Sequence, residues 1–202
     1  MIFNYDKVYQ EICKSLEKLG KKPSLLLHSC CAPCSSACLE RVTKNFETDV
    51  FYYNPNITDS EEYAKRLKEQ IDFVKKVYGD SVKVIEGCYN PQEFYAVAKG
   101  YENLKERDIR CKICYELRLD ACAKTALDKG YEYFTTTLSL SPYKNAEWLN
   151  EIGKSLEQKY GVKYLISDFK KQDGYKKSIE LSKKYGLYRQ DYCGCEFSKI
   201  NR

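Results

Sequence analysis

The sequence is poor in histidine, because His28 is the single imidazole among its 202 residues. One imidazole excludes zinc sites built from two or three histidines. It also excludes a mechanism that needs one imidazole as the acid and another as the base. A metal bound by this chain must therefore be held mainly by sulfur.

Long apolar runs are also missing. No stretch approaches the about 18 consecutive apolar residues of a membrane span. Residues 1–20 alternate charged with apolar side chains instead of forming the apolar region of a secretory signal peptide. We therefore expect a soluble, cytoplasmic protein. Lys and Arg exceed Asp and Glu by 34 to 29, a net charge of +5, which permits a polyanionic partner without requiring one.

Length and composition predict one folded domain covering residues 1–202. The chain is little longer than the about 150 residues of an ordinary domain. Its apolar content of 43% supplies a core, while its charged content of 31% keeps the surface polar. Neither a disordered chain nor a second full domain is expected.

Cysteine, by contrast, is abundant, with 11 residues. The count is odd and the chain shows no export signal, so a disulfide scaffold is disfavoured. Seven of the cysteines fall into three groups, a C-C-x-x-C, a C-x-x-C and a C-x-C: Cys30, Cys31 and Cys34; Cys111 and Cys114; Cys193 and Cys195. All seven are candidate metal ligands, because clustered thiolates select zinc, Cu(I) or iron–sulfur clusters.

The spacing between the groups favours a polynuclear site. The groups are separated by far more than the about 15–20 residues of a zinc ribbon, so three distant segments must converge to form one site. Seven thiols also exceed the four of a tetrahedral ion, which favours a cluster, or a cluster with a second metal, over a single zinc. One or two zinc sites that only stabilise the fold remain the alternative.

The remaining cysteines are expected to fill the core, because an unpaired cysteine behaves as a small apolar residue. They are Cys13, Cys38, Cys88 and Cys122. Cys38 lies one helical turn beyond Cys34 and could share its helix face, so a ligand role for Cys38 stays open.

Strand-like and helical segments alternate along the chain. Strands are predicted at 24–28, 49–53, 82–85, 131–137 and 162–166, and helices at 4–19, 36–45, 60–78, 91–99, 111–128, 146–160 and 174–185. This alternation predicts an α/β fold, a doubly wound and mainly parallel sheet with helices on both faces. Residues 88–128 interrupt the rhythm and are interpreted as a helical insertion that carries the middle cysteine pair. The tail after residue 186 carries the last pair.

The first cysteine group directly follows the first predicted strand. Ligands of such sheets bind beyond the carboxyl ends of the strands. A helix that starts there stabilises nearby thiolates, Cys34 above all. The loops N-P-N-I-T-D and S-L-S-P-Y-K-N leave other strands at the same edge and are expected to line the same pocket.

Five motifs, taken together, closely resemble the QueH-type epoxyqueuosine reductases over residues 23–198. They are H-S-C-C-A-P-C, F-Y-Y-N-P-N-I, R-C-K-I-C-Y-E-L-R-L, T-T-T-L-S-L-S-P-Y-K and Y-R-Q-D-Y-C-G-C-E-F-S. The resemblance implies a Rossmannoid, HUP-like fold related to PP-loop enzymes, and reduction of epoxyqueuosine to queuosine at the wobble position of tRNA. It also implies a 4Fe-4S cluster with an additional mononuclear iron, and no cobalamin. The PP-loop phosphate motif S-G-G-x-D-S is replaced here by S-C-C-A-P-C, so ATP pyrophosphatase activity is not expected.

Reduction of an epoxide to an alkene consumes two electrons and two protons, and no side chain supplies those electrons, so a redox cofactor is required. No G-x-G-x-x-G follows a strand, and a cobalamin-type D-x-H-x-x-G is missing because position 26 is leucine. The clustered thiolates remain, with an external electron donor. We hypothesise that an open iron site binds the epoxide oxygen while the cluster relays electrons. Cys111 and Cys114 with one thiol from each other group are the preferred cluster ligands.

Three further residues are candidates for catalysis. Asp108 precedes Cys111 and could bind the second iron or supply a proton, or could simply cap a helix. His28 ends a strand beside the thiols and could donate to sulfur or substrate, or be a structural imidazole. Tyr115 lies in the second cysteine motif and could contact the modified base.

Aromatic and basic residues are candidates for binding the anticodon loop, because aromatic faces stack on extruded bases and Lys or Arg contacts phosphate. These candidates are Tyr143, Lys144, Tyr188, Arg189 and Tyr192, although most of the 19 tyrosines must serve the core or surface. Lysine pairs at 170–171, 176–177 and 183–184 could form a phosphate-binding stripe or a solvated helix face.

Two other functions stay open at this point. A tRNA sulfur-transfer enzyme would carry persulfide on a cysteine, but such an enzyme normally needs ATP activation. A zinc-stabilised RNA-binding module would use the thiols only to hold the fold.

Overall fold

The computed structural model describes residues 3–200 and contains a sheet of five parallel strands. The strands lie in the order β3-β2-β1-β4-β5. Their bounds are Ser24–Ser29 for β1, Glu47–Tyr52 for β2, Val84–Glu86 for β3, Tyr133–Thr136 for β4 and Lys163–Tyr164 for β5. The predicted parallel α/β fold is confirmed.

β1 is the central strand and is covered on both faces. In register, Leu26 pairs with Asp49 of β2 and with Phe134 of β4. Because side chains alternate along a strand, Leu25 and Leu27 enter one hydrophobic core and Leu26 enters the other. A continuous apolar run of this kind is typical of a parallel strand that is buried on both sides.

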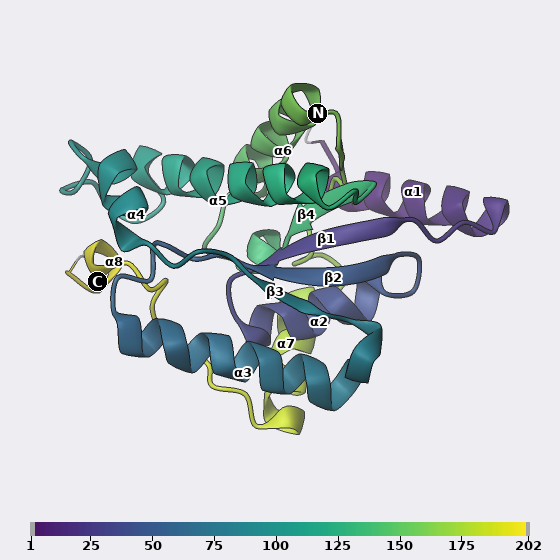
Figure 1. Cartoon of the computed structure of the whole chain (residues 1–202), viewed down its shortest axis with the longest axis horizontal. Coiled ribbons are helices and arrows are strands. Elements are labelled where there is room, and N and C mark those ends of the chain that lie inside the picture. The colour runs from purple at the N-terminus through teal and green to yellow at the C-terminus, as the bar shows by residue number, and fades with distance from the viewer. Residues whose placement is uncertain (1–2, 201–202) are drawn as a thin grey trace.

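Helices cover the sheet on both faces (Figure 1). They are α1 Tyr5–Leu19, α2 Ala32–Val42, α3 Ser60–Tyr78, α4 Pro91–Ala98, α5 Ile109–Asp128, α6 Ala146–Tyr160, α7 Gly174–Tyr185 and α8 Glu196–Ile200, with short 3-10 helices η1 Gly79–Ser81 and η2 Thr137–Leu140. One core packs α1, α2, α3 and α7 against the sheet, and the other packs α5 and α6 against the opposite face. The two cores therefore form a three-layer architecture.

α2 begins earlier than predicted. It starts at Ala32, not near 36, and Cys31 is its N-cap residue. Pro33 lies in the first turn, where its fixed φ suits a helix and its missing N–H is not needed. Cys34 therefore lies inside the first turn of the helix, at its positive end, whereas a helix that started near 36 would have left Cys34 before its first residue.

Other bounds differ at the sheet edges. The predicted strand at 162–166 is reduced to β5. Leu165 N still donates to Phe134 O at 2.9 Å, whereas Ser167 is held by the Asn150 side chain, which accepts from Ser167 N at 3.0 Å and donates to Ser167 O at 2.9 Å. β4 ends at Thr136, where its hydroxyl accepts from Leu138 N and starts η2. α8 was not predicted at all.

The stretch 88–128 divides into two parts. α5 packs on the sheet as the crossover helix between β3 and β4. α4 lies outside those layers, where Phe94 packs with Cys114 and Cys195. Figure 1 shows α4 beside α8 at one end of the molecule, and the rings of Phe94 and Phe197 lie 6.1 Å apart.

Three of the four cysteines predicted to fill the core do so. Cys13 and Cys38 belong to the core under α2, and Cys122 belongs to the core under α5. The prediction for Cys88 was wrong, because that residue is exposed in the coil that follows the short strand β3. Cys38 is fully buried among apolar side chains.

The strand order places a crevice between β1 and β4. The crossovers from β1 run outward through α2 and α3 on one face, while those to β4 and β5 use α5 and α6 on the other. The chain thus reverses direction across the sheet between β1 and β4, which is where open α/β sheets bind ligands. Among residues 3–200, no helix is long and apolar enough to cross a membrane.

Candidate metal centre

The first cysteine group lies in this crevice. β1 ends at Ser29, so Cys30 leaves the strand, Cys31 caps α2 and Cys34 occupies its first turn. The three sulfur atoms all lie within 4.8 Å of one another, with Cys30 and Cys31 Sγ 3.7 Å apart. This spacing allows the three thiols to bind one metal ion or one face of a cluster.

The three thiols differ in pKa. Hydrogen bonds from the Cys31 and Cys34 thiols, helped by the charges of Arg118 and Lys144, hold the pKa of Cys30 well below its usual value against the effect of burial. The same hydrogen bonding raises the pKa of Cys31 to about 12 and that of Cys34 well above the usual value. Cys30 is therefore the thiol of the triad that most favours the thiolate form, and metal binding releases the protons that the thiols still hold.

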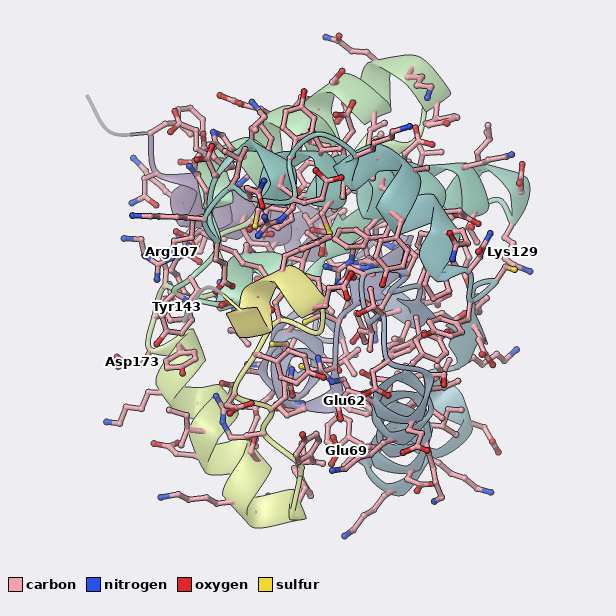
Figure 2. All side chains as sticks on the ribbon, turned by 90° about the vertical axis from the view of Figure 1, so that its left-hand side faces the viewer. Glu62, Glu69, Arg107, Lys129, Tyr143 and Asp173 are labelled. Atoms are coloured by element: carbon pink, nitrogen blue, oxygen red, sulfur yellow. The ribbon has the colours of Figure 1, made fainter. Side chains whose placement is uncertain are left out.

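A cavity of about 570 Å³ opens over this triad. Its wall is formed by the triad, by Arg66 of α3 and Arg118 of α5, by the loop before α6 and by the chain from Arg189 to Cys193. Figure 2 looks onto this end of the molecule, with Arg107 and Tyr143 together at one side and α8 across the middle. The walls come from segments that are far apart in the sequence.

The C-terminal cysteine group reaches the same cavity. Cys193 lines it, and Lys144 Nζ lies 3.3 Å from Cys193 Sγ. The carbonyl of Cys193 accepts from Arg66 Nη1 at 3.4 Å and from Asn56 Nδ2 at 3.5 Å. Gly194 O accepts from Thr58 N at 3.3 Å. The N-P-N-I-T loop thus holds the tail in place but is not part of the cavity wall, so the prediction that this loop lines the pocket was wrong. The same prediction for the S-L-S-P-Y-K-N loop is confirmed, because Ser141, Tyr143 and Lys144 line the cavity.

The middle group lies beside the tail. Cys114 is buried and packs with Cys195, and burial raises the pKa of Cys114 to about 12 and that of Cys195 to about 11. Cys111 Sγ accepts from Arg107 N at 3.3 Å, and burial raises its pKa. Because Cys193 lines the cavity with the triad and Cys195 packs with Cys114, the tail brings all three segments together. Within residues 3–200, the triad is the only group in which three or more potential ligand atoms lie within 4.8 Å of one another.

His28 is placed as a structural imidazole. Its Nε2 lies 3.0 Å from the carbonyl of Tyr53, which can only accept, so Nε2 carries the proton. Nδ1 then accepts from the Thr136 hydroxyl at 2.8 Å. Burial lowers the pKa of His28 to about 3. Both ring nitrogens are occupied, so neither is available to a sulfur or a substrate in this arrangement.

Asp108 and Tyr115 lie in different surroundings. Asp108 is exposed and is the N-cap residue of α5, where its carboxylate accepts from Ile109 N at 2.6 Å. Tyr115 is buried in the core under α5, and Lys144 Nζ lies 5.9 Å from its ring centre. Tyr115 therefore borders the site, whereas Asp108 occupies the capping position that the sequence left as its alternative.

Four of the five residues proposed for RNA contact line the cavity: Tyr143, Lys144, Arg189 and Tyr192. Tyr143 is 55% exposed, with the Arg107 guanidinium 4.9 Å above its ring. The fifth, Tyr188, is absent from the wall; its N–H donates to the Glu69 carboxylate and Lys65 Nζ lies 3.4 Å above its ring.

Three cations of the cavity wall, Arg66, Arg107 and Arg118, were not predicted from the sequence. Arg66 is buried, pairs with Glu62 at 2.6 Å and lies 5.1 Å from the Tyr192 ring. Arg118 follows Cys114 by one helical turn, and that spacing on a cysteine-bearing helix could have identified it.

The lysine pairs are less uniform than the sequence suggested. Those on α7 are exposed, whereas Lys170 is partly buried and donates to Asp168 Oδ1 at 2.8 Å.

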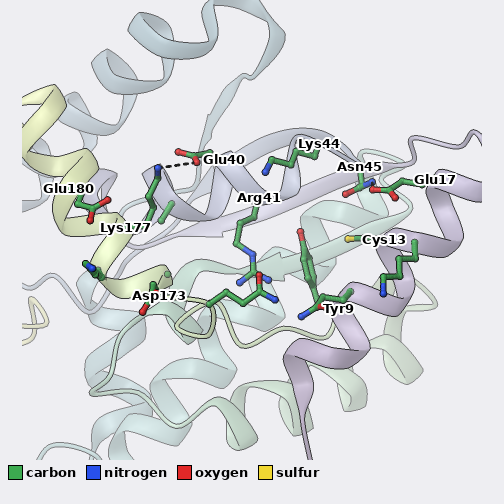
Figure 3. Close-up of a pocket in the computed structure, with 16 residues that line it drawn as sticks. Tyr9, Cys13, Glu17, Glu40, Arg41, Lys44, Asn45, Asp173, Lys177 and Glu180 are labelled. Carbon is green, nitrogen blue, oxygen red and sulfur yellow. Dashed lines mark hydrogen bonds and ion pairs between the residues drawn. The ribbon is translucent and has the colours of Figure 1, made fainter.

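A second cavity of about 580 Å³ lies between α1, α2 and α7 (Figure 3). Its walls carry both signs of charge, including the pair of Lys177 and Glu40 at 3.4 Å. The cavity with the thiols is therefore the better candidate for redox chemistry.

Comparison with known proteins points to one family. Residues 25–201 match the family model described as "Epoxyqueuosine reductase QueH". The curated protein of that name from Staphylococcus epidermidis is 45% identical over 98% of this chain and 86% of its own length. The one from Thermotoga maritima is 40% identical over 89% of this chain and 92% of its own length.

A solved structure shares the fold. The U34-tRNA thiolase NcsA from Methanococcus maripaludis, determined with its [4Fe-4S] cluster, superimposes with a TM-score of 0.53 over 95% of this chain and 67% of that protein. The two sequences are 14% identical, so this likeness concerns the fold alone.

Proposed function

The chain belongs to the QueH family of epoxyqueuosine reductases, and we propose that it reduces epoxyqueuosine at the wobble position of tRNA with a thiol-bound iron–sulfur cluster and an adjacent iron. As a family member it is an oxidoreductase of queuosine biosynthesis. The observation that carries the cofactor proposal is the convergence of three cysteine segments, with the sulfurs of Cys30, Cys31 and Cys34 within 4.8 Å of one another.

The reaction fixes what the site must supply. Removal of the epoxide oxygen leaves an alkene and water, and the balance requires two electrons and two protons for each oxygen removed. No side chain of the cavity provides electrons, so they come from an external donor through a redox cofactor. When bound, an iron–sulfur cluster with an adjacent iron would supply single electrons and a Lewis-acidic position for the epoxide oxygen.

The residues present fit such a group. Its ligands would be sulfur, which iron–sulfur clusters require, and the surrounding cations compensate the negative charge of thiolates. Arg118 is the clearest case, because its buried Nε and Nη1 have no hydrogen-bond partner among residues 3–200. We propose all seven grouped cysteines as ligands. Cys111 and Cys114, with one thiol from each other group, would hold the cluster, and the remaining thiols the adjacent iron.

The cavity rim suits a single-stranded RNA loop. Tyr143 and Tyr192 offer aromatic faces, and Lys144 and Arg189 offer positive charge, which is the combination that binds unstacked bases and their phosphates. We propose that these residues, with Tyr188 at the flank and Tyr115 behind Lys144, bind the modified base and the anticodon loop. The strand order and the position of the cavity support a Rossmannoid, HUP-like assignment of the fold.

The first experiment is anaerobic purification and reconstitution with iron and sulfide, followed by metal analysis and a visible spectrum. We expect a brown protein with iron near four to five per chain, which converts epoxyqueuosine to queuosine in tRNA when a chemical reductant is added. Mass spectrometry of the nucleosides would detect loss of one oxygen. A colourless protein that contains zinc alone would refute the proposal and support an RNA-binding module.

Serine variants test the ligand set. Cys31→Ser, Cys114→Ser and Cys193→Ser each remove one thiol from a different segment, and each is expected to lose iron and activity together. Cys88→Ser is the matched control, because Cys88 is an exposed cysteine outside the cavity wall. Full iron content and activity in all three ligand variants would exclude the convergent site.

A further inference from the structure

We propose that Arg118 is a positioning residue that provides a fixed, buried positive charge for an anionic metal–sulfur group. The inference rests on the proposed function for the identity of that group. Arg118 is 1% exposed, yet it lines the cavity above Cys30 and Cys193. Burial alone would make the position unsuitable for a cation, so the reason for the charge must lie in what the cavity receives.

The positive charge of the guanidinium has no carboxylate partner among residues 3–200. Arginine stays protonated in proteins, and none of the ion pairs between described residues involves Arg118. Its Nη2 donates to Asn54 Oδ1, a neutral partner, at 2.5 Å, and Nε and Nη1 have no partner within hydrogen-bonding distance among residues 3–200. A buried charge without a counter-charge strongly destabilises a fold. The other buried cation of the wall, Arg66, has Glu62 as its partner.

Thiols of all three cysteine segments lie near the guanidinium. Cys30 and Cys193 line the same cavity as Arg118, and Cys114 lies one helical turn before it on α5. These come one from each of the three cysteine segments. Arg118 is therefore central to the converging thiols, and its two unpartnered nitrogens can donate to thiolate or sulfide once these are present.

Asn54 holds this charge in position. Its Oδ1 accepts from Arg118, and its Nδ2 donates to the carbonyl of Ser29 at 2.9 Å. Ser29 directly precedes Cys30, so one buried amide joins the guanidinium to the strand end that carries the triad. The arrangement is rigid before any ligand arrives, which is the property expected of a preorganised charge.

Two consequences distinguish this role from a merely structural one. In the empty protein the unpaired cation is unfavourable, so replacing it with an apolar side chain is not destabilising. In the loaded protein the cation favours the more negative, reduced state of the cluster, so its removal makes reduction harder. A structural arginine would instead contribute the same stability with and without the cluster.

The test compares wild type, Arg118→Met and Arg118→Lys before and after anaerobic reconstitution with iron and sulfide. We expect empty R118M to melt at or above the temperature of empty wild type. After loading, R118M binds iron about tenfold more weakly and is reduced at a more negative potential in a dye-mediated titration of the visible spectrum. R118K keeps the charge and stays near the wild-type potential. Lys183→Met removes an exposed charge from α7 and is the matched control.

Asn54→Asp provides a second variant that keeps Arg118. A carboxylate at this position compensates the guanidinium, so the loaded protein is expected to be reduced at a more negative potential, as in R118M. Equal loss of stability in empty and loaded R118M, or unchanged potentials in R118M and N54D, would overturn the role of Arg118 while wild type still binds its cluster. A wild type that takes up no iron would refute the proposed function itself, and this inference with it.

Discussion

Gly194 separates the two cysteines of the tail, and its backbone explains why glycine stands there. Its φ is 111°, and an added Cβ would lie 2.8 Å from Ile57 Cγ1. The residue is therefore needed both for its conformation and for the close approach of the tail to the N-P-N-I-T loop. The position of Cys193 beside Lys144 depends on this contact.

Replacing Gly194 with alanine is expected to release Cys193 from the cavity. The strained backbone and the clash with Ile57 destabilise the tail by about 1–3 kcal/mol, and we expect a loss of iron content and activity. Gly130→Ala is the control, because Gly130 has a φ of 75° but nothing within 4 Å of an added Cβ. G130A should lower the melting temperature while keeping iron. Full iron in G194A would contradict the assignment of Cys193 as a ligand.

At the residue scale, the sequence predicted thiols better than cations. Grouped cysteines stand out by spacing, and the structure brings their segments together. Arg118 and Arg66 do not stand out, because an arginine at helical spacing is typical of a solvated face and only the packing of α3, α5 and the tail shows that it is buried. The sequence left two roles open for His28, because its hydrogen-bond partner Thr136 lies 108 positions away and only the fold shows that the two residues meet.

At the scale of single elements, capping residues and periodicity predicted the bounds of helices with clear caps, but they did not predict the bounds of elements at the ends of strands. The helices at 146–160 and 174–185 have the predicted bounds, because Asn145 caps the first and glycine residues end both. The start of α2 was predicted too late, because the extended backbone of Cys31 follows β1 without an intervening loop. Tertiary pairing decides such boundaries, and local propensity does not.

At the start of α5, a pair of variants can show whether Asp108 caps the helix or binds a metal. As the N-cap of α5 it satisfies a free N–H at the start of the helix that carries Cys111. Asp108→Asn keeps a capping oxygen, so its stability and activity are expected to match wild type. Asp108→Ala is expected to lose about 1 kcal/mol of stability, measured by urea unfolding. Loss of iron in both variants would instead show a carboxylate ligand.

At the scale of the whole molecule, basic side chains gather around the cavity that holds the proposed metal site. The net charge of +5 is modest, but Arg66, Arg107, Arg118 and Lys144 all surround one cavity. This local positive field favours a polyanionic substrate and a negatively charged cofactor at the same end of the sheet. Composition alone could not reveal that, because it averages the cavity with the surface lysines of α7.

Arg107 connects the proposed RNA-binding rim to the thiols, and the roles of its backbone and its side chain can be tested separately. Its φ of 77° suits glycine, its N–H donates to Cys111 Sγ, and its guanidinium lies over Tyr143. Arg107→Gly therefore keeps the backbone contact and removes only the side chain. We expect unchanged iron content and spectrum, with binding of an anticodon stem-loop weakened about tenfold, or about 1.4 kcal/mol, in fluorescence anisotropy.

The control for that experiment lies at the opposite end of α5. Lys129 follows the helix of 20 residues that begins just after Arg107, so the two cations lie about 30 Å apart along the helix axis. Lys129→Gly removes the same charge and should leave RNA affinity nearly unchanged at fixed ionic strength. Because phosphate contacts release counterions, wild-type affinity should fall with added salt, and R107G should show a smaller salt dependence. Equal weakening by both variants would mean that RNA responds only to net charge and that the rim beside Tyr143 is not its binding surface.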